Sequence, residues 1–146
     1  GFSGWRTIRT LDTAAWVGRF SVQGEVTVAG GHGISANRRV QVSPRGTYTA
    51  SVHAMHSPAR PLLLRIDWFG TDGPLGYSYD TFAPVGLDWK RLSITAVAPD
   101  NATHASLYLF CNNTGQVGDI MWADGWMFEH GSSLSRWLPG QFRWTR

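Results

Sequence analysis

The segment ADGWMFEHGSSLSRWLPG, residues 123–140, places three side chains that could do chemistry inside an aromatic stretch. Asp124, Glu129 and His130 offer oxygen and nitrogen atoms, so a catalytic carboxylate, a metal ligand and a structural strand end all fit these residue types. The chain as a whole is sparing with charge, because only 16% of its residues are Asp, Glu, Lys or Arg. An acid in such surroundings therefore requires a specific explanation.

Signatures of hydrolytic enzymes do not accompany these residues. A glycosidase needs two carboxylates about 5 Å apart for retention or about 6.5–9.5 Å apart for inversion, whereas the acids of this chain fall mostly at expected turns and strand ends. Neither GxSxG nor HExxH occurs. The histidines show no ligand spacing beyond the HAMH of His53 and His56, which lies on an expected strand before Pro58. The sequence therefore predicts no enzyme, no catalytic residue and no zinc site.

Cys111 is the single cysteine and ends the apolar run ASLYLFC, so it cannot form an intrachain disulfide. No basic pattern nearby would favour a reactive thiolate. We expect Cys111 to be a buried side chain that acts as a small hydrophobe.

Charge and hydropathy exclude two classes of partner. The net charge is +3, but the 13 Lys and Arg residues are scattered along the chain, whereas nucleic-acid binding needs them clustered. No run of 18 apolar residues exists, so no membrane insertion is expected. The opening GFSGW has neither a Met nor a signal-peptide pattern, and we expect residues 1–146 to be one domain of a larger protein.

Turn residues and short alternating runs dominate the chain, and no helical period of useful length occurs. Strands are expected within residues 24–30, 38–44, 44–55, 60–80, 89–100, 103–111 and 116–131, the last bent at Gly125. Within 60–80 the strand is expected to run into a Gly-rich turn at Asp72, Gly73 and Pro74. No segment offers the crossover helices of a parallel sheet. The pattern predicts an all-β jelly-roll β-sandwich of two antiparallel sheets with about eight strands or more.

Aromatic side chains fall on the polar phase of two expected strands. Tyr108 and Phe110 alternate with the apolar Leu107 and Leu109, and Trp122 points away from the face of its apolar neighbours. We expect Tyr108 and Trp122 to stand on the solvent side of one sheet.

The order of segments resembles a known family. PRGTYTASVHAM, LDWKRLSITAVAPDNATHASLYLF and MWADGWMFEHGSSLSRWLPG are similar to spaced blocks of the jelly-roll carbohydrate-binding modules of bacterial glycanases. The "E-G" followed by a tryptophan and "P-G" most resembles the jelly-roll domains of minor tail and adhesion proteins of actinobacterial siphophages. The resemblance covers residues 43–140, and the first forty residues match weakly.

The resemblance implies a role for Asp124. In this family the equivalent acid often helps to hold a structural calcium ion, which takes six to eight oxygen ligands. Backbone carbonyls of early residues would have to complete the shell, because Asp12 and Glu25 are the only nearby acids. The alternative is that Asp124 accepts hydrogen bonds from backbone amides at the bulge, with Glu129 and His130 at the solvent rim. No other cofactor is expected.

The resemblance also implies glycan binding, which exposed aromatic rings and planar hydrogen-bonding groups would perform. The expected function is that of a non-catalytic phage tail module in the virion, binding host cell-surface carbohydrate and contacting other tail subunits or copies of itself. The alternatives are a structural tail domain that binds no sugar and an accessory module of a secreted glycanase. Each aromatic residue also has a purely structural alternative. The expected glycan-binding residues are Tyr108, Phe110, Trp122, Trp68, Asp67 and Arg65.

Overall fold

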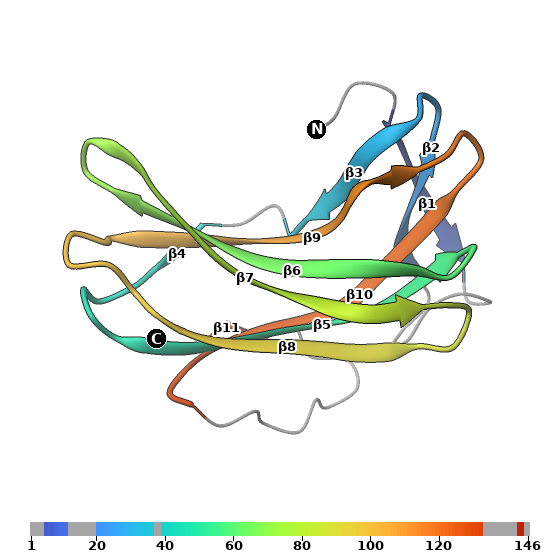
Figure 1. Cartoon of the computed structure of the whole chain (residues 1–146). Coiled ribbons are helices and arrows are strands. Elements are labelled where there is room, and N and C mark those ends of the chain that lie inside the picture. The colour runs from blue at the N-terminus through green and yellow to red at the C-terminus, as the bar shows by residue number, and fades with distance from the viewer. Residues whose placement is uncertain (1–4, 12–19, 37–38, 133–142, 145–146) are drawn as a thin grey trace.

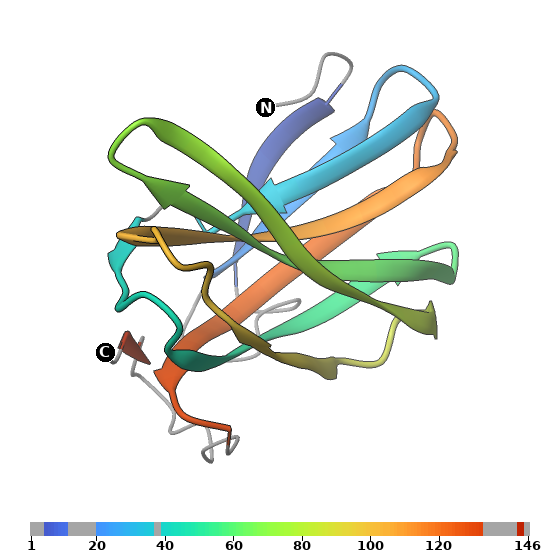
Figure 2. The same ribbon diagram turned by 60° about the vertical axis from the view of Figure 1, so that its left-hand side comes forward.

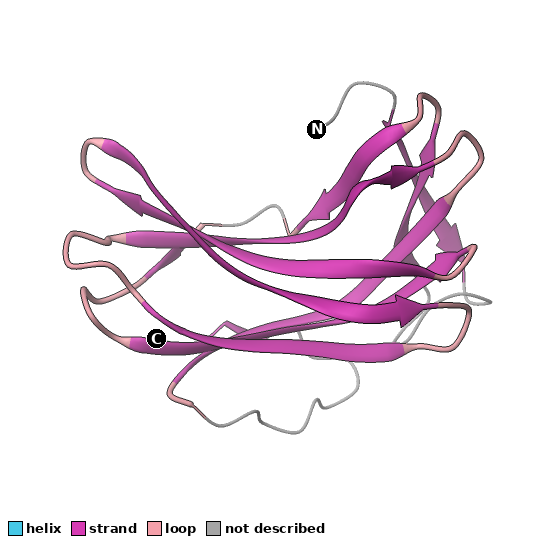
Figure 3. Ribbon diagram, viewed as in Figure 1, coloured by secondary structure: helices cyan, strands magenta, loops and turns pink. Residues whose placement is uncertain are grey.

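A computed structural model of the chain describes residues 5–11, 20–36, 39–132 and 143–144. The described residues form strands joined by turns (Figures 1 and 3) and contain no helix long and apolar enough to cross a membrane. The strands are β1 Trp5–Leu11, β2 Phe20–Val26, β3 Gly30–Ser35, β4 Val40–Gln41, β5 Thr47–Ser57, β6 Arg60–Gly70, β7 Gly73–Val85, β8 Lys90–Val97, β9 His104–Gly115, β10 Ile120–His130 and β11 Arg143–Trp144.

Two sheets pack face to face. Sheet A has the strand order β1-β2-β10-β5-β8, with β11 pairing β10, and sheet B has the order β3-β9-β6-β7, with β4 pairing β9. All pairs are antiparallel except that between β10 and the two-residue β11. Figure 2 shows β1, β2 and β3 together towards the top of the view. The expectation of an all-β sandwich of two antiparallel sheets is confirmed.

The core lies between the sheets and follows the period of two along β5, β6, β8 and β9. On β5 the buried series runs Tyr48, Ala50, Val52 and Ala54, and the inner faces of β6, β8 and β9 add further apolar side chains. Cys111 belongs to this core and is fully buried, as expected.

Several elements differ from the sequence expectation, since β1, the first half of β2, nearly all of β3 and β11 lie outside the expected strand ranges. The run at residues 24–30 is not one strand, because β2 ends at Val26 and β3 begins at Gly30, so Val28 lies at a bend and is 64% exposed. The segment after Asp72 is not only a turn: it forms β7, which pairs with β6 from Gly70↔Gly73 onward.

Candidate functional site

The outer face of sheet B brings four of the expected residues together. Arg65 and Asp67 lie on the outer phase of β6, because Leu64 and Ile66 between and beside them are buried. On β9, Tyr108 is the cross-strand partner of Arg65, and Phe110 is the partner of the adjacent Leu63. Register therefore places Tyr108 and Phe110 beside Arg65.

Two further tyrosines complete this face from the other side of β6. Tyr79 pairs with Arg65 and Tyr77 pairs with Asp67. Tyr77 is 59% exposed and Tyr79 is 57% exposed, and their rings are 5.8 Å apart between centroids with a 45° tilt. Sequence reasoning missed both residues, although the alternation in GYSYD is the signal of a strand.

Arg65 lies at the centre of these rings. Its Cζ atom is 5.0 Å from the ring centroid of Tyr77, 5.1 Å from that of Tyr108 and 5.8 Å from that of Phe110. These distances fall within the range in which a guanidinium is attracted to an aromatic face. We call the set Arg65, Asp67, Tyr77, Tyr79, Tyr108 and Phe110 the aromatic face of sheet B.

Asp67 fixes the orientation of the guanidinium. The Nε atom of Arg65 lies 2.7 Å from Oδ1 of Asp67, and an Nη2 hydrogen is donated to Oδ2 over 3.2 Å. Such a two-point contact holds the planar fork in one direction. The remaining guanidinium hydrogens and the carboxylate lone pairs can address a ligand that lies on the rings.

A glycine lets the rings of β9 lie against β3. A Cβ atom on Gly33 would come within 2.6 Å of the Leu109 carbonyl oxygen, 3.0 Å of the Phe110 ring and 3.1 Å of the Tyr108 ring. The backbone of β3 at Gly33 therefore supports the two rings from beneath, and a side chain at this position would displace them.

Trp68 lies in the core, so the expectation that it is an exposed platform was wrong. Its side chain is 2% exposed, its indole N–H donates to Ser78 Oγ over 2.9 Å, and its ring centroid is 6.2 Å from that of Tyr48. The physical reason is strand alternation: Trp68 follows the outward Asp67 by one residue and must face inward.

Trp122 points outward, but from the other sheet. It lies on β10 between Met55 of β5 and Gln23 of β2, all in sheet A, and it is half-buried. Its indole N–H is buried and has no hydrogen-bond partner among the described residues. The expectation that Tyr108 and Trp122 share the solvent side of one sheet was wrong, because successive strands β9 and β10 belong to different sheets.

Asp124 lies at the expected irregularity of β10. Its Oδ1 atom accepts the backbone N–H of Gly125 over 2.8 Å, where Gly125 has φ of 61° and the register with β5 shifts between Asp124 and Met127. The hydrogen-bonding alternative for Asp124 is confirmed, while calcium binding stays a prediction. Glu129 is buried rather than at the rim, and His130 is exposed.

An open hollow of about 340 Å³ lies near β4, between residues 41–44 and 102–104. The one Phe, Tyr or Trp residue that lines it, Tyr48, is buried and accepts the Ser43 N–H through its hydroxyl over 2.7 Å. The hollow thus presents no exposed Phe, Tyr or Trp ring, and we place the candidate site on the aromatic face of sheet B.

Comparison with known proteins identifies the architecture. No protein-family model matches the chain, and no curated protein matches it. Among solved structures, the second family 16 carbohydrate-binding module is similar to 86% of this chain over 86% of its own length, with a TM-score of 0.60 and 15% identity. The chain has a carbohydrate-binding-module fold. TmCBM61, solved in complex with β-1,4-galactotriose, is similar over 89% of this chain and 90% of its own length, with a TM-score of 0.58 and 16% identity.

A viral protein also contains this fold. The enzymatically active domain of tailspike protein 4 from bacteriophage CBA120 is similar over 88% of this chain, with a TM-score of 0.61 and 15% identity. The matched part is 19% of that tailspike chain. The carbohydrate-binding-module fold therefore occurs both as a separate module and within a much longer phage protein.

Proposed function

We propose that this domain is a non-catalytic module that binds glycan on the aromatic face of sheet B. The observation that carries the proposal is the pair of exposed rings, Tyr77 and Tyr79, beside a guanidinium held by Asp67. Large exposed aromatic side chains gathered on one face of a domain mark a binding site.

The chemistry of this face suits a sugar ring. A pyranose presents C–H groups on its flat faces, which pack on aromatic rings, and hydroxyl groups at its edge, which exchange hydrogen bonds with planar polar groups. Tyr77 and Tyr79 supply the platform, while Arg65 and Asp67 lie where edge hydroxyls would reach them. The Asp67 carboxylate is engaged by Arg65, an arrangement suited to orienting a ligand rather than to proton transfer.

The affinity of one such domain should be modest. Association must overcome a rigid-body entropy cost of about 4 kcal/mol or more, so a shallow site with two platforms should bind at micromolar to millimolar strength. Repeated copies would raise the avidity by about 10²–10⁴.

The finer proposal concerns the parent protein. We propose a tail or adhesion protein of a phage virion, where the domain would bind host cell-surface carbohydrate next to other tail subunits. The sequence resemblance and the occurrence of the fold in a phage tailspike support this setting. The similarity to separate carbohydrate-binding modules supports the alternative, an accessory module of a secreted glycanase.

A glycan array followed by calorimetric titration of any hit tests the proposal. Tyr77→Ala and Tyr79→Ala should each weaken binding by about tenfold or more while changing the melting temperature little, because exposed rings contribute few core contacts. Val97→Ala, which truncates an exposed apolar residue of sheet A, is the matched control and should bind like the parent.

Three outcomes would redirect the proposal. Loss of binding in Trp122→Ala but not in the tyrosine variants would move the site to sheet A. Hits confined to plant polysaccharides would favour the glycanase module, whereas bacterial surface glycans would favour the tail protein. If no glycan binds and the domain associates with tail proteins, the structural alternative replaces glycan binding.

A further inference from the structure

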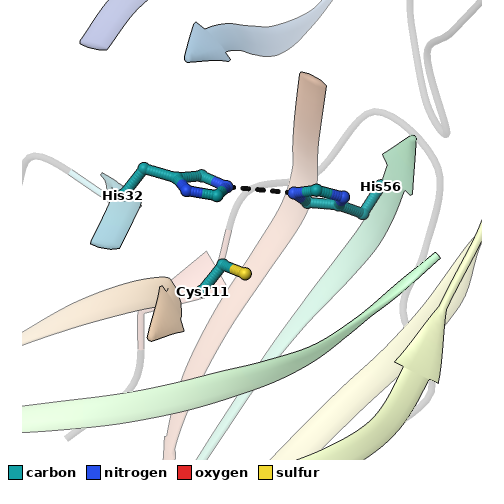
Figure 4. Close-up of side chains that lie close together, drawn as sticks. All are labelled: His32, His56 and Cys111. Carbon is teal, nitrogen blue, oxygen red and sulfur yellow. Dashed lines mark hydrogen bonds between the residues drawn. The ribbon is translucent and has the colours of Figure 1, made fainter. Parts of the chain in front are cut away.

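Three residues with metal-binding atoms meet inside the sandwich, apart from the aromatic face. His32 of β3, His56 of β5 and Cys111 of β9 are all buried, and their ligand atoms lie within 4.8 Å of one another. Figure 4 shows the two imidazoles edge to edge, with the thiol of Cys111 directed towards them. We call this set the His₂Cys cluster.

Strand alternation explains why these residues converge. His32 and Cys111 are direct cross-strand partners in sheet B. His56 continues the inward series of β5 after Val52 and Ala54, so it faces them from sheet A. His53, three residues earlier, lies on the opposite face of β5, so His53 and His56 cannot both bind one ion. His56 is 24 positions from His32 and 55 positions from Cys111 in the sequence, so no local motif identifies the cluster.

The hydrogen bonds of the two rings leave both Nε2 atoms facing each other. The Nδ1 atom of His32 lies 3.2 Å from the Gly30 carbonyl oxygen, and Nδ1 of His56 lies 2.6 Å from the Pro58 carbonyl oxygen. A carbonyl oxygen only accepts, so each Nδ1 carries the hydrogen. In the neutral rings both Nε2 atoms then hold lone pairs, and these atoms are 3.0 Å apart. The hydrogen bond drawn between these atoms in Figure 4 therefore requires one ring to carry an additional proton, and without that proton the two lone pairs repel unless a metal cation lies between them.

This arrangement is the one that metal-binding histidines usually have. A ligating imidazole donates its other N–H to a carbonyl or carboxylate, which fixes the tautomer and aims the free nitrogen. We propose that the His₂Cys cluster binds one Zn²⁺ ion through Nε2 of His32, Nε2 of His56 and Sγ of Cys111. Thiolate and imidazole together select zinc over calcium and magnesium.

The required movements are small. Zinc at about 2.0–2.1 Å from each nitrogen would hold the two Nε2 atoms about 3.3 Å apart, a few tenths of an ångström more than observed. Sγ would have to approach by up to about 1.3 Å to reach about 3.5 Å from each nitrogen.

The surroundings support the ligands and act on the charge of the ion. A Cβ atom on Gly115 would come within 2.4 Å of His32 Nδ1, so this position is glycine to leave room for the ring. Beside the cluster, the buried Asp119 carboxylate lies 2.7 Å from Nε of Arg60. A zinc ion with one thiolate carries a net single positive charge, which the Asp119 carboxylate attracts and its ion-pair partner Arg60 repels. The ion would tie β3 and β9 of sheet B to β5 of sheet A.

Cobalt substitution tests the site without any mutation. The purified chain, stripped of metal under reducing conditions, should take up one Co²⁺ ion and develop a thiolate-to-cobalt charge-transfer band in the near ultraviolet. Stoichiometric Zn²⁺ should abolish this band and raise the melting temperature, because the ion binds only the folded state. A cobalt complex without the thiolate band, or no uptake of either ion, would overturn the proposal even if every variant misfolds.

Variants then test each ligand. Cys111→Ala should lose the charge-transfer band, and both Cys111→Ala and His56→Gln should bind zinc about 100-fold more weakly or worse. His104→Gln is the matched control, because this histidine lies at the other end of β9 and contacts Thr103. Zinc affinity equal to that of the parent in a folded Cys111→Ala or His56→Gln, or an equal loss in His104→Gln, would refute the ligand set. Glycan binding on the aromatic face plays no part in these measurements.

Discussion

His53 is a buried histidine on the outer phase of β5, between Arg91 of β8 and Asp124 of β10. The pKa of His53 is lowered from 6.5 to about 4, chiefly by burial and also by the charge of Arg91, while the hydrogen bond with the Gly125 backbone opposes both effects. The side chain is therefore neutral in the folded protein at neutral pH, although it would be half protonated near pH 6.5 in the unfolded chain.

This residue should make the domain sensitive to acid. Between pH 6.5 and 4, His53 is protonated in the unfolded chain but stays neutral in the folded protein. The contribution of His53 to the free energy of unfolding is therefore complete above pH 6.5 and decreases as the pH falls below it. We expect the His53 contribution to be lower by about 1–2 kcal/mol at pH 5 than at pH 7.

Urea unfolding of the parent and of His53→Gln at both pH values isolates this contribution, because the other titrating groups are common to the two proteins. The free energy of unfolding of the variant should change less between pH 7 and 5. Parallel pH dependence in the two proteins would contradict the assignment.

Single side chains were predictable from the sequence where alternation was followed strictly. Tyr108 and Phe110 were expected on the outward phase of their strand, and the structure places the candidate residues Arg65 and Asp67 beside them. Trp68 was wrongly predicted to be exposed because it follows the polar Arg65 and Asp67 in the sequence. Strand alternation places the residue after an outward Asp67 on the inner face.

At Gly33, which has no side chain, the backbone of strand β3 lies directly against the Tyr108 and Phe110 rings of the aromatic face. Gly33→Ala should destabilise the domain by about 1–3 kcal/mol, because the new methyl group would press against the Leu109 carbonyl and the rings above it. It should also weaken glycan binding by displacing Tyr108 and Phe110.

Gly86→Ala is the control for this substitution, since a Cβ atom there meets only Ala59 at 3.6 Å. Urea unfolding and titration with the same glycan measure the two effects. Equal stability and affinity of the two alanine variants would show that the rings do not depend on Gly33.

Elements were predictable where the chain alternates without interruption, as in β5 and β9. Strand β7 was missed because Gly73, Pro74 and Gly76 at its start carry the composition of a loop. Pairing with β6 supplies the hydrogen bonds that override this local preference.

Calcium binding through Asp124 is a property of the whole molecule, because its other ligands would come from early residues. We expect the chelated domain to remain folded, since the carboxylate already accepts the Gly125 amide, and Asp124→Ala to lower the free energy of unfolding by about 1–3 kcal/mol. Any bound calcium should add stability only by mass action.

Melting curves with and without added Ca²⁺ make the measurement, with Asp100→Ala as an exposed control. A melting temperature that collapses by tens of degrees in chelator and returns with calcium alone would show that the ion is required for folding.

The fold class followed from composition and period, but the partnership of strands did not. Alternation shows that a strand has an inner and an outer face, yet it does not say in which sheet the strand lies. Tyr108 and Trp122 were therefore correctly predicted to point outward, but they lie in different sheets. The meeting of His32 with His56 has the same cause, because it depends on two sheets facing each other.

The central position of β10 in sheet A has a consequence for how the chain acquires its structure. β10 lies between β2 and β5, and it follows every other long strand described. During synthesis, β2 and β5 cannot pair with β10 until residues 120–130 have been made. Until then, the edges of β2 and β5 that will pair with β10 stay exposed to other nascent chains. Because so many of its pairings are distant in sequence, the domain should refold slowly for its size, and premature termination before β10 should yield aggregation instead of a smaller folded unit.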